Sequence, residues 1–245
     1  QCKRRRNSGP PPYPGITMEQ AEIPFADLPF DRTEVCRGLG ITQASAPGQF
    51  EILLNEAISE AARRCRPQYA YRLFPTERID PDSISAGGAK FATGHVITRY
   101  LKNAEYLAFF IATAGREFDA WLRELKTEDD ILKEFLADAI GSEIAEATAR
   151  IMARRMSGTL AEKGMRISNS YSPGYCGWPV SDQQQLFELF PPQICGVELN
   201  SSSLMSPVKS VSGVIAVGSQ VQKMPYGCAI CGRKDCYKNR LKQKI

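Results

Sequence analysis

The chain has 245 residues, of which 43% are hydrophobic and 24% are charged, and its formal net charge is +4 at pH 7. This length and balance predict a soluble globular protein with one substantial core. No run approaches the roughly 18 apolar residues that a membrane-spanning helix needs, so a membrane span is excluded.

The first 22 residues combine a basic cluster with a proline run and few apolar groups. Such a segment cannot bury enough surface to offset its ordering entropy, so we expect residues 1–22 to be disordered. A helix is predicted from Ser45 to just before Pro67, because apolar residues recur there at helical spacing. The apolar stripe consists of Phe50, Leu53, Leu54, Ala57, Ile58 and Ala61.

Three short stretches rich in aromatic and branched residues follow, each bounded by Gly, Pro or Asn. They predict strands over residues 68–74, His95–Leu101 and Tyr106–Thr113, with the last two joined as a hairpin through residues 102–105.

Helices dominate the middle of the chain. A long helical pattern runs from Ile131 to about Glu162, with a break expected at Gly141. Beyond it, we expect a helix over residues 181–190, capped by Ser181, and a strand over residues 214–217. A further helix, before the long one, is marked by Phe118, Trp121, Leu122 and Leu125.

Strands that lie next to separate helices predict an α+β fold. We expect an α+β domain over residues 23–221, after the disordered segment, and a cysteine-rich basic tail over residues 222–245.

Two loops carry most of the functional argument. The first, Ser172-Pro-Gly-Tyr-Cys-Gly-Trp-Pro179, contains glycines that permit positive φ and prolines that stiffen the backbone, and it presents Tyr175 near its tip. Alone, it is most simply interpreted as a rigid turn packed by its aromatic residues. The second loop is Leu204-Met-Ser-Pro-Val-Lys-Ser-Val-Ser-Gly213.

Together the two loops resemble, in order and separation, the signatures of the activation domain of cobalamin-dependent methionine synthase. Ile144-Ala-Glu-Ala147 resembles the Ala-Glu-Ala segment of the same family, whose Glu contacts S-adenosylmethionine. The resemblance spans about residues 25–220, and residues 34–115 look like the smaller stand-alone members. It implies an antiparallel twisted sheet flanked by helices.

The resemblance also implies a function. The chain would position S-adenosylmethionine so that its methyl group reaches the cob(I)alamin of a partner methionine synthase, after a reductase or other electron donor has reduced the cobalt. Tyr175 would lie near the cobalt face, and no residue is assigned as catalytic. The implied ligand-binding residues are Glu146, Ser170, Pro173, Gly174, Tyr175, Cys176, Gly177, Met205, Pro207 and Ser210.

The sequence departs from the family at Ser170, where many members have an Arg that engages the carboxylate of S-adenosylmethionine. A serine cannot supply a charged bidentate fork. Arg166 and Lys209 are candidate substitutes. The alternative function is a docking or electron-transfer module for a corrinoid protein that does not bind S-adenosylmethionine. Glu143 lies one helical turn from Glu146, and the two could share a face.

The tail contains Cys228, Cys231 and Cys236, whose spacing lets three thiolates hold one metal. Cys176 or Cys195 is a candidate fourth ligand. Zinc and an iron–sulfur cluster both remain open. The alternative is a set of free thiols.

Five of the eight cysteines are scattered, unlike a secreted disulfide framework, so we expect a reducing cytoplasm. The basic ends are suited to an acidic partner, and nucleic acid is the weaker alternative. The single histidine, His95, argues against a Ser–His hydrolase. No glycine-rich nucleotide motif or Walker A motif occurs, and no cobalamin-binding Asp-x-His-x-x-Gly segment is present, so the partner would carry the cobalamin.

Overall fold

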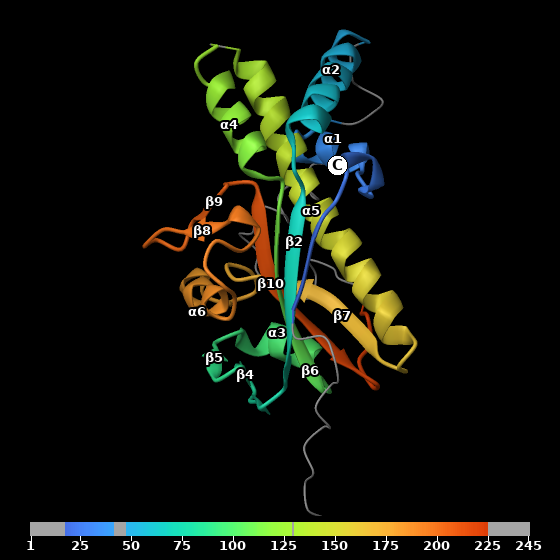
Figure 1. Ribbon diagram of the computed structural model, residues 1–245, viewed down its shortest axis with the longest axis vertical. Helices are drawn as coiled ribbons and strands as arrows, with labels where there is room; N and C mark the ends of the chain where they lie inside the picture. The colour runs from blue at the N-terminus through green and yellow to red at the C-terminus, as the bar shows by residue number, and fades with distance from the viewer. Residues whose placement is uncertain (1–17, 42–47, 129, 225–245) are drawn as a thin grey trace, which may run out of the picture.

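The computed structural model describes residues 18–41, 48–128 and 130–224. At its centre is an antiparallel five-stranded sheet (Figure 1) with the strand order β1-β2-β6-β10-β7. The middle strand, β6, is buried along its whole length because side chains pack on both of its faces. The strands are β1 (Met18–Glu22), β2 (Gln68–Pro75), β6 (Tyr106–Thr113), β7 (Arg166–Tyr171) and β10 (Ser210–Gly218).

One face of the sheet is crossed diagonally by the long helix α5 (Ile131–Ala161), as Figure 1 shows. Asp130 caps this helix, since its carboxylate accepts a hydrogen bond from the Lys133 amide at 3.0 Å. Three more helices share the hydrophobic core on this side: α1 (Arg32–Gly38), α2 (Gly48–Arg64) and α4 (Arg116–Leu125).

The opposite face is covered by short elements around a second core that includes Phe91, Phe109 and Trp178. The helices here are α3 (Gly94–Leu101) and α6 (Gln183–Glu188), with 3-10 turns at η3 (Val180–Asp182) and η4 (Ile194–Gly196). The small strands are β3 (Arg78–Ile79), β4 (Ile84–Ala86), β5 (Ala89–Phe91), β8 (Glu198–Leu199) and β9 (Met205–Ser206), and one further turn, η1 (Phe25–Asp27), follows β1.

This arrangement is the α+β fold with an antiparallel sheet and flanking helices that the sequence predicts. The expected strands over residues 68–74 and 106–113 are present, and the strand expected over residues 214–217 is part of the longer β10. No helix in the described part of the chain has the length and apolar character to cross a membrane.

The strand predicted over His95–Leu101 is wrong, because this segment is helix α3. Ile97, Thr98 and Leu101 are buried on one side, at the 1 and 3 spacing of a helix, and the Thr98 hydroxyl donates to the Gly94 carbonyl one turn earlier. The expected hairpin through residues 102–105 is therefore a helix-to-strand connection.

The break expected at Gly141 is also wrong, since α5 runs through it. A glycine is present there because a Cβ atom would lie 2.4 Å from Phe118 Cε1 and 2.8 Å from Lys209 Cγ. Because Gly141 has no side chain, α4 and the loop before β10 can pack closely against α5 at this point. The glycine does not interrupt the helix.

Two further expectations need correction. Met18–Glu22, within the segment expected to be disordered, pair with β2 as an edge strand. Ser181 is not a helix cap, because it lies inside η3, which is preceded by Pro179. The buried carboxylate of Asp182 instead accepts hydrogen bonds from the Ala92 amide and from Trp178 Nε1.

Candidate functional site

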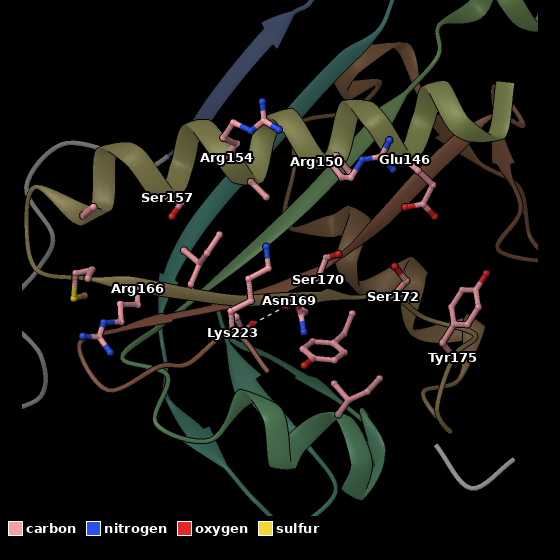
Figure 2. Close-up of a pocket in the computed structure, with 18 residues that line it drawn as sticks. Glu146, Arg150, Arg154, Ser157, Arg166, Asn169, Ser170, Ser172, Tyr175 and Lys223 are labelled. Atoms are coloured by element: carbon pink, nitrogen blue, oxygen red, sulfur yellow. Dashed lines mark hydrogen bonds between the residues drawn. The ribbon is translucent and has the colours of Figure 1, made fainter. Parts of the chain in front are cut away.

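A groove of about 840 Å³ lies between α5 and β7, with the loop that carries Tyr175 at one end (Figure 2). Three of the residues implied by the family resemblance line it: Glu146, Ser170 and Tyr175. The structure thus brings together residues from a helix, a strand and a loop that lie far apart in the sequence.

The helical wall of the groove is one face of α5. From Glu146, the residues that line it recur at spacings of three, one, three, one and three, so they lie on one stripe while the core residues Met152 and Met156 lie on the other side. The stripe consists of Glu146, Ala149, Arg150, Ala153, Arg154 and Ser157.

The strand wall is shaped by a β-bulge in β7. Ile215 and Val217 on β10 pair with Ser170 and Ile167, so β7 contains one more residue than its partner across this interval. The Ser168 hydroxyl accepts the hydrogen bond of the Ala216 amide at 2.9 Å and thereby replaces a backbone acceptor. Ile167 packs in the α5 core, and because of the extra residue, exposed Ser170 also faces the groove.

Glu143 and Glu146, one helical turn apart on α5, differ in burial and in partners. Glu143 is buried, accepts a hydrogen bond from the Asp31 amide at 2.8 Å and pairs with Arg150. Burial raises the pKa of the Glu143 carboxyl, against the opposing effect of these hydrogen bonds. Glu146 is exposed in the groove and forms no ion pair with any described residue.

The loop after β7 is a tight turn held by its own backbone. The Gly174 amide donates to the Trp178 carbonyl at 2.8 Å, and the Trp178 amide donates to the Tyr175 carbonyl at 2.9 Å. Gly174 and Gly177 have φ values of 90° and 91°, which favour glycine. Trp178 is buried, whereas Tyr175 is 42% exposed at the end of the groove.

The other loop residues implied by the resemblance do not line the groove. Pro173, Gly174, Cys176 and Gly177 form the frame of the turn, and of these only Pro173 is buried. In the second loop, Met205 lies in β9, Pro207 is buried, and the Ser210 hydroxyl donates to Thr113 Oγ1 and to the Pro207 carbonyl.

Lys209 is not a free cation for a ligand. Its Nζ lies 2.7 Å from Asp138 Oδ1 and 3.0 Å from Ser142 Oγ, and its side chain is 10% exposed. The second loop therefore fastens β10 to α5, one to two helical turns away from Glu146.

The groove is rich in positive charge. Among the described residues, Arg150, Arg154, Arg166 and Lys223 line it, and Glu146 is the one carboxylate in the lining. Arg166 was a candidate from the sequence, but Arg150, Arg154 and Lys223 were missed. The two helical arginines could have been found by extending the stripe from Glu146 in steps of four residues.

The proposed metal ligands Cys228, Cys231 and Cys236 lie outside the described residues. Within the described ranges, no cluster of three or more His, Cys, Asp or Glu side chains is arranged to hold a metal. Cys195 is buried, and desolvation raises the pKa of its thiol to about 12. Cys176 is partly exposed.

Comparison with known proteins gives matches to one protein family and to solved structures. The family model described as the activation domain of vitamin B12 dependent methionine synthase matches residues 89–242, which is more than half of the chain. A crystal structure described as the MetH reactivation domain bound to AdoHcy superposes with a TM-score of 0.65 at 18% sequence identity, covering 86% of this chain and 81% of that one. No curated protein sequence matches the chain.

Proposed function

Because the chain belongs to the family of vitamin B12-dependent methionine synthase activation domains, we propose that it holds S-adenosylmethionine in the groove between α5 and β7. From there it would present the methyl group to the cob(I)alamin of a partner corrinoid protein. The observation that carries this proposal is that Glu146, Ser170 and Tyr175 meet in one groove although they come from three separate elements.

The charges of the residues that line the groove complement the charges of S-adenosylmethionine. S-adenosylmethionine carries a sulfonium and an ammonium, both cationic, and a carboxylate. Glu146 offers an uncompensated carboxylate to the cationic groups, and the ring of Tyr175 offers an aromatic face at the same end of the groove. The positive charges further along the groove suit the carboxylate. The MetH neighbour was crystallised with AdoHcy, which is the product that S-adenosylmethionine leaves after it has lost its methyl group.

The chemistry asks the chain for placement only. Cob(I)alamin on the partner supplies the nucleophile that takes the methyl group from sulfur, and no proton moves, so no general base is required. Tyr175 stands exposed on a rigid turn beside the mouth of the groove, where it can fix the ligand against the incoming corrin face. A rigid turn matters because an in-line transfer tolerates little displacement.

One observation favours the alternative function, a docking or electron-transfer module that binds no S-adenosylmethionine. Ser170 supplies no positive charge at the position where the family commonly has Arg. Binding of the free ligand to the isolated protein separates the two functions, because only the first requires it.

The experiment is calorimetry with S-adenosylmethionine on the wild type, Glu146→Gln and the control Glu162→Gln, which changes an exposed glutamate beyond the end of α5. Glu146→Gln should weaken binding by about 1–3 kcal/mol because the cationic groups of the ligand lose a charge partner. The control should bind like the wild type. No binding by the wild type would contradict the proposal.

The partner is tested separately by co-elution with a cobalamin-loaded methionine synthase fragment that lacks an activation domain. We expect a complex that requires the loaded cobalamin domain. Failure to associate in either cobalt oxidation state would contradict the partner assignment while leaving the ligand site intact.

A further inference from the structure

The question left by Ser170 is which group would bind the carboxylate of the ligand. An amino-acid carboxylate in a groove needs a cationic donor, preferably a guanidinium that can bind it through two hydrogen bonds. Lys209 is held by Asp138 and Ser142. The remaining candidates are the four cations of the groove, and their positions differ along its length.

Helix α5 and strand β7 run antiparallel, since only residues 162–165 connect them. Measured from that connection, Arg150 lies 11 residues back along α5, or about 16 Å at the rise of a helix. Ser170 lies four residues along β7 from Arg166, or about 13 Å at the rise of a strand. The two residues therefore lie opposite each other, as Figure 2 shows, with Arg150 on the helix across from Ser170 on the strand.

Arg150 differs from the other cations because it is held in place. Its Nη2 donates to the Pro29 carbonyl at 2.9 Å and to Oε1 of the buried Glu143. Within the described residues, Nε and Nη1 have no acceptor, and the side chain is 42% exposed. A guanidinium fixed at one nitrogen loses less conformational entropy when a ligand binds the others.

The net charge of the groove also favours an anion, even when the negative charge of Glu143, the partner of Arg150, is included. In the described part of the chain, Arg150, Arg154, Arg166 and Lys223 bring four positive charges to the groove. Glu146 in the lining and Glu143, the partner of Arg150, bring two negative charges, which leaves a surplus of two. Glu146 lies one turn from Arg150, at the end near Tyr175, so the groove is negative at that end and positive beyond it.

We propose that Arg150 binds the carboxylate of the ligand from the helical wall, in place of the cation that β7 lacks at Ser170. This inference rests on the proposed function. In it, Glu143 is a positioning residue that orients the guanidinium, and Arg150 is a binding residue that selects ligands with a carboxylate. The ligand then spans the groove with its sulfonium toward Glu146 and Tyr175 and its carboxylate toward Arg150.

The first test changes the ligand and leaves the protein intact. Calorimetry should show that the wild type binds decarboxylated S-adenosylmethionine roughly 10- to 100-fold more weakly than S-adenosylmethionine, the range for loss of a charge-assisted hydrogen bond. Arg150→Gln should lose the same factor for S-adenosylmethionine and should no longer distinguish the two ligands. The control, Arg155→Gln, removes an exposed cation of the same helix that does not line the groove and should keep the discrimination.

Because Arg150→Gln removes the partner of buried Glu143, a second variant protects the test from a folding defect. Ser170→Arg on the Arg150→Gln background places a guanidinium on the opposite wall and should restore both affinity and discrimination. Thermal unfolding of each variant verifies the fold.

The outcomes separate the two proposals. If the wild type binds both ligands equally, or Arg150→Gln still discriminates, the role of Arg150 is wrong while the S-adenosylmethionine site stands. If the wild type binds neither ligand, both the site and the role of Arg150 are wrong.

Discussion

Lys209 Nζ lies 2.7 Å from Asp138 Oδ1, an ion pair that joins the loop before β10 to the first half of α5. The lysine is nearly buried and the aspartate is 61% exposed, so the pair sits at the surface end of a packed contact. The aliphatic stem of Lys209 packs close to Gly141 and contributes to this contact independently of its charge.

We therefore expect Lys209 to act as a structural residue. Lys209→Ala should lower the free energy of unfolding by about 1–3 kcal/mol through lost packing and a lost hydrogen bond. Lys209→Met retains the stem and should cost less than about 1 kcal/mol, because the exposed Asp138 keeps its hydration. Chemical denaturation measures both. Loss of S-adenosylmethionine binding in a stable Lys209→Met protein would instead indicate a ligand role.

A second prediction compares two glycines of the same helix. Gly141→Ala should destabilise the protein by about 1–3 kcal/mol, because the new methyl group would overlap Phe118. Gly158→Ala should stabilise it by about 1 kcal/mol, since in the described part of the chain no side chain and no other segment lies within 4 Å of its Cβ position and alanine favours a helix. Opposite shifts in melting temperature are expected. Equal shifts would contradict the tight packing at Gly141.

The elements predicted most accurately from the sequence are those in which the buried residues follow a single regular spacing or an unbroken apolar run. Helix α4 has an apolar stripe that faces a single core, and β6 is a short, continuous run of apolar and aromatic residues, as expected of a central strand. The segment His95–Leu101 was assigned wrongly because it is too short for periodicity to separate a helix from a strand, and its composition of branched and aromatic residues favoured the strand.

The arrangement of the candidate site was predictable only in part. The family motifs located Glu146, Ser170 and Tyr175, and the structure places all three in one groove. Two features depend on tertiary structure and leave no local signal. The bulge at Ser168 requires knowledge of the pairing with β10, and the anchoring of Arg150 requires that Pro29 and α1 pack beside α5. Lys209, a sequence candidate for the missing charge, is instead held by α5.

A third prediction concerns alkaline pH. Burial raises the pKa of Cys195 from 9.0 to about 12, so the unfolded thiol loses its proton at a lower pH than the folded one. The protonated Cys195 thiol therefore makes its full contribution to the free energy of unfolding below pH 9, and this contribution falls as the pH rises from 9 towards 12. Between pH 9 and 10 the loss from this residue is about 1 kcal/mol.

Chemical denaturation of the wild type and of Cys195→Ala at pH 9 and at pH 10 measures this contribution. The free energy of unfolding should fall less steeply with pH in Cys195→Ala than in the wild type. Cys65→Ala offers a parallel comparison, because burial raises the pKa of that thiol to about 11. If Cys195→Ala kept the full alkaline slope, the titration of Cys195 would not be its cause.

The last prediction is that Cys228, Cys231 and Cys236 bind one metal centre, because two thiols separated by two residues can grip one ion and a third thiol follows close by. Protein purified without oxygen should contain about one equivalent of zinc, or iron in a cluster with visible absorption. Replacing Cys228 and Cys231 with Ser should remove the metal, whereas the control Cys65→Ala changes a buried thiol of the core and should retain it. Cys176→Ala tests the fourth ligand, since this partly exposed thiol lies in the same loop as Tyr175. If Cys176→Ala loses the metal, the cysteine-rich tail must lie beside the groove. A wild-type protein with neither zinc nor iron near one equivalent would show that the three cysteines are free thiols.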